Sequence, residues 1–181
     1  MTIAQSDLLF WMLARITGLV AFLTLGIAVL SGVALRTSVL DRVGSNRAWL
    51  ELHTFCTVMW VPAGGLHLLS LLADRTARIR PIDLVVPFGI DYGPIAVGLG
   101  TIALDLFVLV AITGWMKGQM SQRLWSWIHR LSYLAFGATF VHAVLSGTDF
   151  SSPAVSAIAW SFAFVVLVLA AARLAWGRLP T

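Results

Sequence analysis

The sequence is poor in charged residues and in cysteine. Only 11% of its 181 residues are Asp, Glu, Lys or Arg, whereas 59% are hydrophobic. A soluble domain carries about a quarter charged residues, so this composition excludes an ordinary soluble fold. The single cysteine, Cys56, excludes an internal disulfide and any cysteine-based zinc or iron–sulfur site.

Motifs of nucleotide chemistry are also missing. The sequence has no P-loop, no dinucleotide-binding fingerprint and no nucleophile constellation. We therefore expect no catalytic residues of these kinds, no flavin or nicotinamide domain within these residues, and no nucleic-acid partner. The N-terminal MTIAQSDLLF lacks a basic region, so we interpret the first apolar run as a membrane span and not as a removed signal peptide.

Long apolar runs dominate the chain. Crossing the hydrocarbon core of a bilayer takes about 20 apolar residues per helix. The predicted fold class is all-α integral membrane: a bundle of five transmembrane helices forming a single domain over residues 1–181. The expected spans are residues 8–35, 49–73, 95–116, 124–145 and 154–176. In the long outer loop, the segment IDLVVPFGIDYGP is apolar but broken by Pro87 and Gly89, and predicts a segment lying at the membrane interface.

Basic residues are distributed unequally between the two sides that five spans define. One side collects Arg36, Arg42, Arg47, Lys117, Arg123, Arg130, Arg173 and Arg178. The other side collects Arg75, Arg78 and Arg80, offset by Asp7, Asp74, Asp83, Asp91 and Asp149. The positive-inside rule makes the first side cytoplasmic. We therefore expect a multi-pass protein of the cytoplasmic membrane, with the N-terminus outside and the C-terminus in the cytoplasm.

All four histidines lie in the second and fourth spans. This topology puts His53 and His129 at one depth in the inner half of the membrane, and His67 and His142 at one depth in the outer half. The spacings of 14 and 13 residues correspond to about 21 and 20 Å along a helix. Fourteen steps fall about 40° short of four turns and thirteen about 140° short. The fourth span must therefore bend, with Gly137 as a candidate, or present its histidines on different flanks.

The histidines admit three interpretations. The simplest is a set of bundle-buried side chains, each hydrogen-bonded to a neighbouring helix. Ionisable groups inside a membrane usually mark function, however, and neutral imidazole is a good ligand of haem iron. Zinc or copper is the rival. Two histidines from separate helices at each level favour axial ligands of a flat macrocycle over a tetrahedral site.

Several motifs support the haem interpretation through a family resemblance. The runs WSWIHRLSYLAF, VHAVLSGTD and LVVPFGIDYGP, with the His-x13-His and His-x12-His spacings, resemble the ferric reductase-like transmembrane domain superfamily. That superfamily includes the membrane part of NADPH oxidases and bacterial haem b electron-transfer subunits. The resemblance implies two haem b groups. His53 and His129 would ligate the inner iron, and His67 and His142 the outer iron.

Cations near the histidines are candidate partners of the haem propionates. Propionates are anionic and attract charged donors near the interface. Arg47, Arg123 and Arg130 are the candidates at the inner haem, and ordinary anchoring at the cytoplasmic face is the alternative for each. Arg15 and Asp105 lie inside the first and third spans at depths that differ by about 5 Å. An ion pair, a propionate contact for Arg15 and a proton relay through Asp105 all remain open.

The predicted function is transmembrane electron transfer through two stacked b haems. The resemblance implies a cytoplasmic flavin reductase or quinone as donor, with flavin only on a partner. The acceptor would be external: Fe(III), oxygen or a partner oxidoreductase. One alternative is a haem b subunit of a separate oxidoreductase, without catalysis of its own. The other is a haem-free membrane bundle that binds a metal ion.

Overall fold

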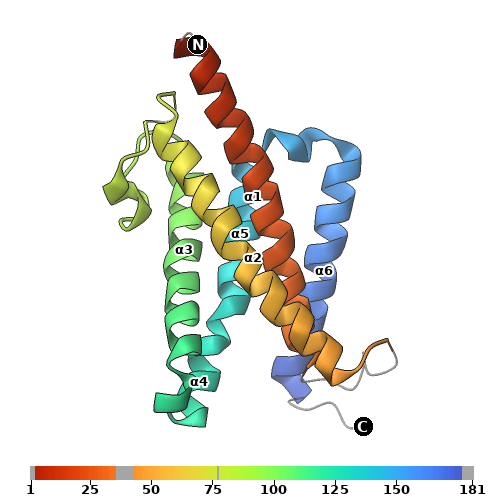
Figure 1. The fold of residues 1–181 in the computed structure, drawn as a ribbon. Coiled ribbons are helices and arrows are strands. Elements are labelled where there is room, and N and C mark those ends of the chain that lie inside the picture. The colour runs from red at the N-terminus through yellow and green to blue at the C-terminus, as the bar shows by residue number, and fades with distance from the viewer. Residues whose placement is uncertain (1–2, 36–42, 77, 177–181) are drawn as a thin grey trace. The chain divides into compact units, whose positions relative to one another are not determined.

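The computed structural model describes residues 3–35, 43–76 and 78–176, and they are predominantly helical (Figure 1). The helices are α1 (Ile3–Ala34), α2 (Asn46–Ala73), α3 (Pro94–Trp115), α4 (Gln122–His129), α5 (Leu131–Ser146) and α6 (Pro153–Trp176). Of these, α1, α2, α3 and α6 are long and apolar enough to cross a membrane. The all-helical class is thus confirmed, with long apolar helices at the first, second, third and fifth predicted spans. Arg36, Arg42 and Arg178 lie outside the described residues.

The fourth predicted span is divided into two shorter helices. α4 has 8 residues and α5 has 16, and the break lies at Arg130. The N–H of Arg130 reaches the carbonyl of Ser126 at 3.3 Å, and the next turn closes through a tighter bond from Tyr133 to Arg130 at 3.1 Å. The bend expected between the two histidines is therefore present, but it follows His129 directly and does not lie at Gly137.

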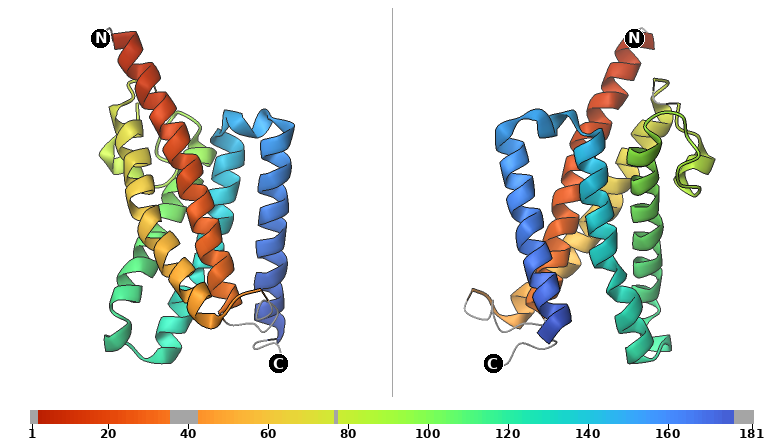
Figure 2. Two further views of the ribbon diagram at one scale, coloured as in Figure 1. Left: turned by 45° about the vertical axis from the view of Figure 1, so that its right-hand side comes forward. Right: turned by 180° about the vertical axis from the view of Figure 1, so that it is seen from behind.

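The residues group into two compact units. The first unit comprises Met1–Asp74 and Asp149–Thr181, and contains α1, α2 and α6. α1 and α2 lie side by side and antiparallel (Figures 1 and 2). α2 begins at the N-cap Ser45, whose hydroxyl accepts from the N–H of Ala48, and it runs without interruption through Pro62. α6 packs on α1, and the ring of Phe150 just before it meets Phe22 edge-to-face.

The second unit comprises Arg75–Thr148 and contains α3, α4, α5 and two short 3-10 helices, η2 (Pro81–Leu84) and η3 (Lys117–Gln119). α3 packs along α5, and the views in Figure 2 agree on this. α3 starts cleanly because Gly93 takes a left-handed conformation, with φ of 55°, and Pro94 fills the first helical position. Ser121 caps α4 by accepting from the N–H of Leu124.

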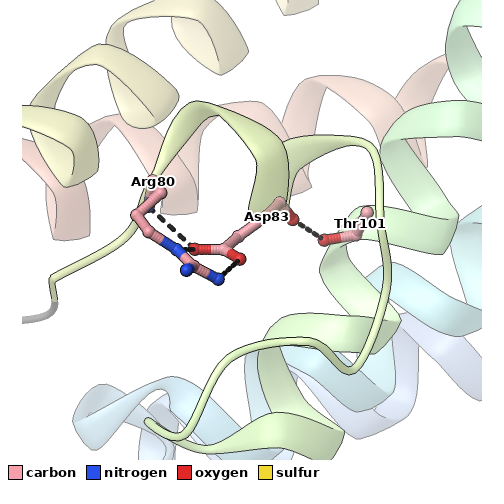
Figure 3. A network of polar contacts seen from close by, with 3 residues as sticks. All are labelled: Arg80, Asp83 and Thr101. Atoms are coloured by element: carbon pink, nitrogen blue, oxygen red, sulfur yellow. Dashed lines mark hydrogen bonds and ion pairs between the residues drawn. The ribbon is translucent and has the colours of Figure 1, made fainter.

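The segment from residue 78 to residue 93 is held on the start of α3 by polar contacts (Figure 3). Asp83 accepts from the backbone and the guanidinium of Arg80, at 2.9 to 3.1 Å, and its own carbonyl accepts from the hydroxyl of Thr101 at 2.8 Å. Farther along, the ring of Phe88 lies against Gly98, where an added Cβ would come within 2.2 Å of it. The predicted interfacial segment is therefore an ordered structure with two points of attachment to α3.

Acidification should weaken the attachment of this segment. The hydrogen bonds from Arg80 lower the pKa of Asp83. A lowered folded-state pKa gives stability that is complete above the ordinary Asp pKa of about 3.9 and is lost as the pH falls through the lowered value. We expect pepsin to cleave within residues 85–92 faster as the pH falls from about 4 toward 2, beyond pepsin's own pH dependence on an unfolded peptide. In Asp83→Asn the rate should be higher and independent of this titration; equal profiles would contradict the assignment.

Candidate functional site

Both histidines of α2 bond to the backbone of α1. The Nδ1 of His53 lies 2.7 Å from the carbonyl oxygen of Ala28, and the Nδ1 of His67 lies 2.8 Å from that of Ala14. A carbonyl oxygen only accepts, so Nδ1 carries the proton in each ring. The lone pair of the neutral imidazole then lies on Nε2. This is the form in which histidine ligates a metal, with its other nitrogen held by a hydrogen bond.

A glycine on α1 makes room for each of these rings. A Cβ at position 18 would lie 2.9 Å from the Nδ1 of His67, and one at position 32 would lie 3.3 Å from the Nδ1 of His53. Each glycine follows the accepting alanine by four residues, so ring, carbonyl and glycine occupy a single turn of α1. A Cβ at position 18 would force the ring of His67 to move, and one at position 32 would require the ring of His53 to give way by a few tenths of an ångström. We call each such set of a carbonyl and a glycine four residues later a glycine notch.

The pairing of α1 with α2 follows a seven-residue spacing. Residues at this spacing are buried or half-buried on both helices: Ala14, Gly18, Ala21, Leu25, Ala28 and Gly32 on α1, and His53, Cys56, Trp60, Ala63, His67 and Ser70 on α2. Small residues at this spacing let two helices approach closely. Because the two notches and the two histidines are each 14 residues apart, both rings meet α1 in the same way. The offset of about 40° expected for a straight helix does not separate them.

The second unit contains the same arrangement at His142. Its Nδ1 lies 2.7 Å from the carbonyl oxygen of Ala96 on α3, and a Cβ at position 100 would come within 2.8 Å of that Nδ1. Ala96 and Gly100 again are four residues apart. The hydroxyl of Ser146 lies 3.5 Å from the same ring nitrogen. A glycine notch on the first helix of a pair, filled by a histidine of the second, thus occurs in both units.

His129 has a different setting. It is the last residue of α4, and its ring stacks on Trp125, with ring centroids 4.9 Å apart and planes inclined by 22°. The Nζ of Lys117 lies over the ring of Trp125, 4.3 Å from the ring centroid. The stacking on Trp125, one helical turn away, orients the imidazole plane of His129. In the other three histidines a bond to a backbone carbonyl does this.

The three arginines predicted near the inner haem are all exposed. Arg47 bonds to Glu51 at 2.8 Å, one turn along the surface of α2. The guanidinium of Arg130 lies over the ring of Trp127 at 4.9 Å, and Arg123 is exposed near the start of α4. Their assignment to propionates stays a prediction. Gly64 and Gly65, next to His67 in the sequence, do not touch its ring: Gly64 lies near Trp60, and Gly65 has no such neighbour within 4 Å.

Arg15 pairs with Asp149. Its guanidinium bonds to both carboxylate oxygens of Asp149, with Nε donating at 3.1 Å, and lies over the ring of Trp11 at 4.3 Å. The pair joins α1 to η4 (Thr148–Ser151) within the first unit, while Asp105 is exposed on α3. Arg15 thus has a carboxylate partner within its own unit, and its pairing with Asp105, which belongs to the second unit, stays a prediction. Depth alone pointed to Asp105, although Asp149 is 134 residues from Arg15 in the sequence.

One comparison with known proteins identifies the family. The family model described as a domain of unknown function (DUF8596) matches residues 9–149. The chain belongs to this family. The match runs from α1 to Asp149 and so includes all four histidines, the three glycine notches and both members of the Arg15–Asp149 pair. Neither the curated proteins nor the solved structures gave a match. The resemblance to ferric reductase-like domains stays a prediction.

Sequence reasoning found the histidines but missed the residues that position them. Gly18, Gly32 and Gly100 are three of 15 glycines and carry no chemistry of their own. The signal was nevertheless present, because Gly18 and Gly32 repeat the 14-residue spacing of His53 and His67. Among the described residues, no three His, Cys, Asp or Glu side chains gather in a group that would hold a metal ion.

A glycine-to-alanine pair tests the notch in the second unit. Gly100→Ala should destabilise the protein by about 1–3 kcal/mol, because the new Cβ must displace His142 or break its bond to Ala96. Gly137→Ala, in open space on α5, should be neutral or stabilising by up to about 1 kcal/mol, since alanine favours helix. Unfolding in mixed detergent–SDS micelles measures both. Equal stability of the two variants would contradict the notch.

Proposed function

We propose that this protein binds two b haems through its four histidines and carries electrons across the cytoplasmic membrane. The observation that carries the proposal is the setting of His53, His67 and His142. Each has Nδ1 bonded to a backbone carbonyl and its ring seated in a glycine notch. A histidine serving only as a helix-to-helix bond has no need of this repeated geometry. An axial ligand needs it, because the notch presets the tautomer and the ring plane.

The donor chemistry fits haem iron. Neutral imidazole in apolar surroundings is a standard axial ligand of b-type haem, and bound haem supplies reversible one-electron transfer between Fe(III) and Fe(II). His53 and His67 on α2 are separated by about 21 Å along the helix, which suits two irons at two depths. By the depths predicted from the sequence, His53 pairs with His129 and His67 with His142.

The membrane topology is part of the proposal. α4 and α5 together run from Gln122 to Ser146, which is long enough for the fourth predicted span despite the break at Arg130. The excess of basic residues at one end favours a cytoplasmic C-terminus and an external N-terminus. The segment 78–93 then lies at the outer interface, where its exposed apolar side chains Ile82, Val85 and Phe88 meet lipid head groups.

Electrons would pass from a cytoplasmic donor, a flavin reductase or quinone, to an external acceptor such as Fe(III), oxygen or a partner oxidoreductase. This direction follows the predicted topology and the resemblance to ferric reductase-like domains. The family match covers the helices that carry the four histidines.

Haem content of designed double variants tests both the cofactor and the pairing. The purified wild-type protein should show two low-spin b haems per chain in oxidised and dithionite-reduced spectra. His67→Gln/His142→Gln, which removes both ligands of one iron, should retain one haem. His53→Gln/His142→Gln, which removes one ligand from each, should lose both. Ser146→Ala, beside His142, is the matched control and should retain two.

Other outcomes separate the alternatives. A colourless wild-type protein that binds Zn²⁺ would replace the haem proposal with metal-ion binding. In a third outcome, a flavin reductase reduces both haems of the protein in vesicles, but no electrons reach ferricyanide enclosed in the vesicles. This result would indicate a subunit that needs a partner enzyme. The reverse pattern, with both haems lost in His67→Gln/His142→Gln and one retained in His53→Gln/His142→Gln, would overturn the pairing but not the cofactor.

A further inference from the structure

Trp125 is a buried residue in contact with both a cation and a histidine. Its side chain is 9% exposed, it stacks on His129, and the Nζ of the exposed Lys117 lies 4.3 Å from its ring centroid. All three residues belong to the second unit, on η3 and α4. Trp125 thus contacts both an exposed cation, Lys117, and the predicted ligand His129.

The indole N–H of Trp125 is buried without a hydrogen-bond acceptor among the described residues. An indole N–H only donates, and leaving a buried donor unpaired costs free energy. Any group that pairs with this N–H must therefore be a hydrogen-bond acceptor. The ammonium of Lys117 nearby favours an acceptor that carries negative charge.

The first unit repeats the pattern. Trp49 precedes His53 by four residues, as Trp125 precedes His129, and the indole N–H of Trp49 is also buried without an acceptor among the described residues. Two tryptophans in the same sequence relation to the two inner histidines point to a function linked to those histidines. Packing alone would not require both donors to be buried and unpaired.

We propose that the Nε1–H of Trp125 donates a hydrogen bond to a propionate carboxylate of the porphyrin whose iron His129 ligates, with Lys117 as the neighbouring cation. This proposal rests on the haem-binding function proposed above. A carboxylate near His129 is within reach because Trp125 lies one helical turn away, about 5.4 Å along the axis. A lipid phosphate is the less suitable acceptor, since Nε1 is buried from the surface.

The test uses the full-length protein with its haems in detergent. Trp125→Phe, and benzothienylalanine at position 125, each remove the N–H; the second keeps the size and shape of the indole. Lys117→Met removes only an exposed charge. We expect one of the two haems to transfer to excess apomyoglobin about 10- to 100-fold faster in both Trp125 variants, as loss of a charge-assisted hydrogen bond implies.

The reduction potential of the same haem should fall in all three variants, because a less neutralised carboxylate disfavours the electron-rich Fe(II) state. Its propionate band in the resonance Raman spectrum should shift in the Trp125 variants. Trp127→Phe is the matched control: Trp127 is exposed on the same helix, and its loss should change neither haem.

The outcomes distinguish the two proposals. A wild-type protein without haem overturns the function and this contact together. Two haems in the wild type, with transfer rate, potential and Raman band unchanged in the benzothienylalanine variant, overturn the contact alone. A Trp125 fluorescence change between lipid-free micelles and phosphatidylglycerol vesicles, with unchanged haem potentials, would assign the N–H to a lipid phosphate and overturn it likewise.

Discussion

The hydrogen bond from a histidine Nδ1 to a backbone carbonyl of the adjacent helix is the interaction on which the candidate site depends. In apolar surroundings such a bond is strong, and leaving either group unpaired is costly. It fixes the tautomer, the ring plane and the distance between two helices in one contact. His53 and His67 make it to α1, and His142 makes it to α3.

The contact imposes conditions on the rest of each helix pair. The ring reaches the carbonyl only if the backbone of the partner helix is uncovered, which explains Gly18, Gly32 and Gly100. Two such contacts on one helix pair must agree in register, which explains the common 14-residue spacing and the small residues between the notches. Where the spacing is 13 residues, the helix breaks at Arg130, and His129 is oriented by stacking on Trp125 instead.

Much of the architecture could be predicted from the sequence, because long apolar runs and histidine spacing are local signals. The helical class, four long apolar helices and a bend in the fourth predicted span are present. The location of the bend was not predictable, since the flexible Gly137 was a better candidate than Arg130 by propensity. The pairing of Arg15 with Asp149 was not predicted, because a contact across 134 residues depends on how η4 folds back on α1. The glycine notches were missed because their hydrogen-bond acceptors are backbone carbonyls. Every residue has one, so residue identity does not reveal which carbonyl is used.

That last feature has a consequence for how this family can vary. The acceptors at positions 14, 28 and 96 are main-chain oxygens, which every amino acid supplies, so these alanines need only be small enough for the helices to approach. The glycines four residues later are harder to replace, because a Cβ at position 18 or 100 would come within 3 Å of the imidazole, and one at position 32 would lie 3.3 Å from it. Among related sequences, the residues that supply the accepting carbonyls should therefore vary. The glycines, which form no hydrogen bond with the histidines, should be retained. In an alignment of distant relatives, a retained glycine would therefore mark the position where a histidine contacts the neighbouring helix.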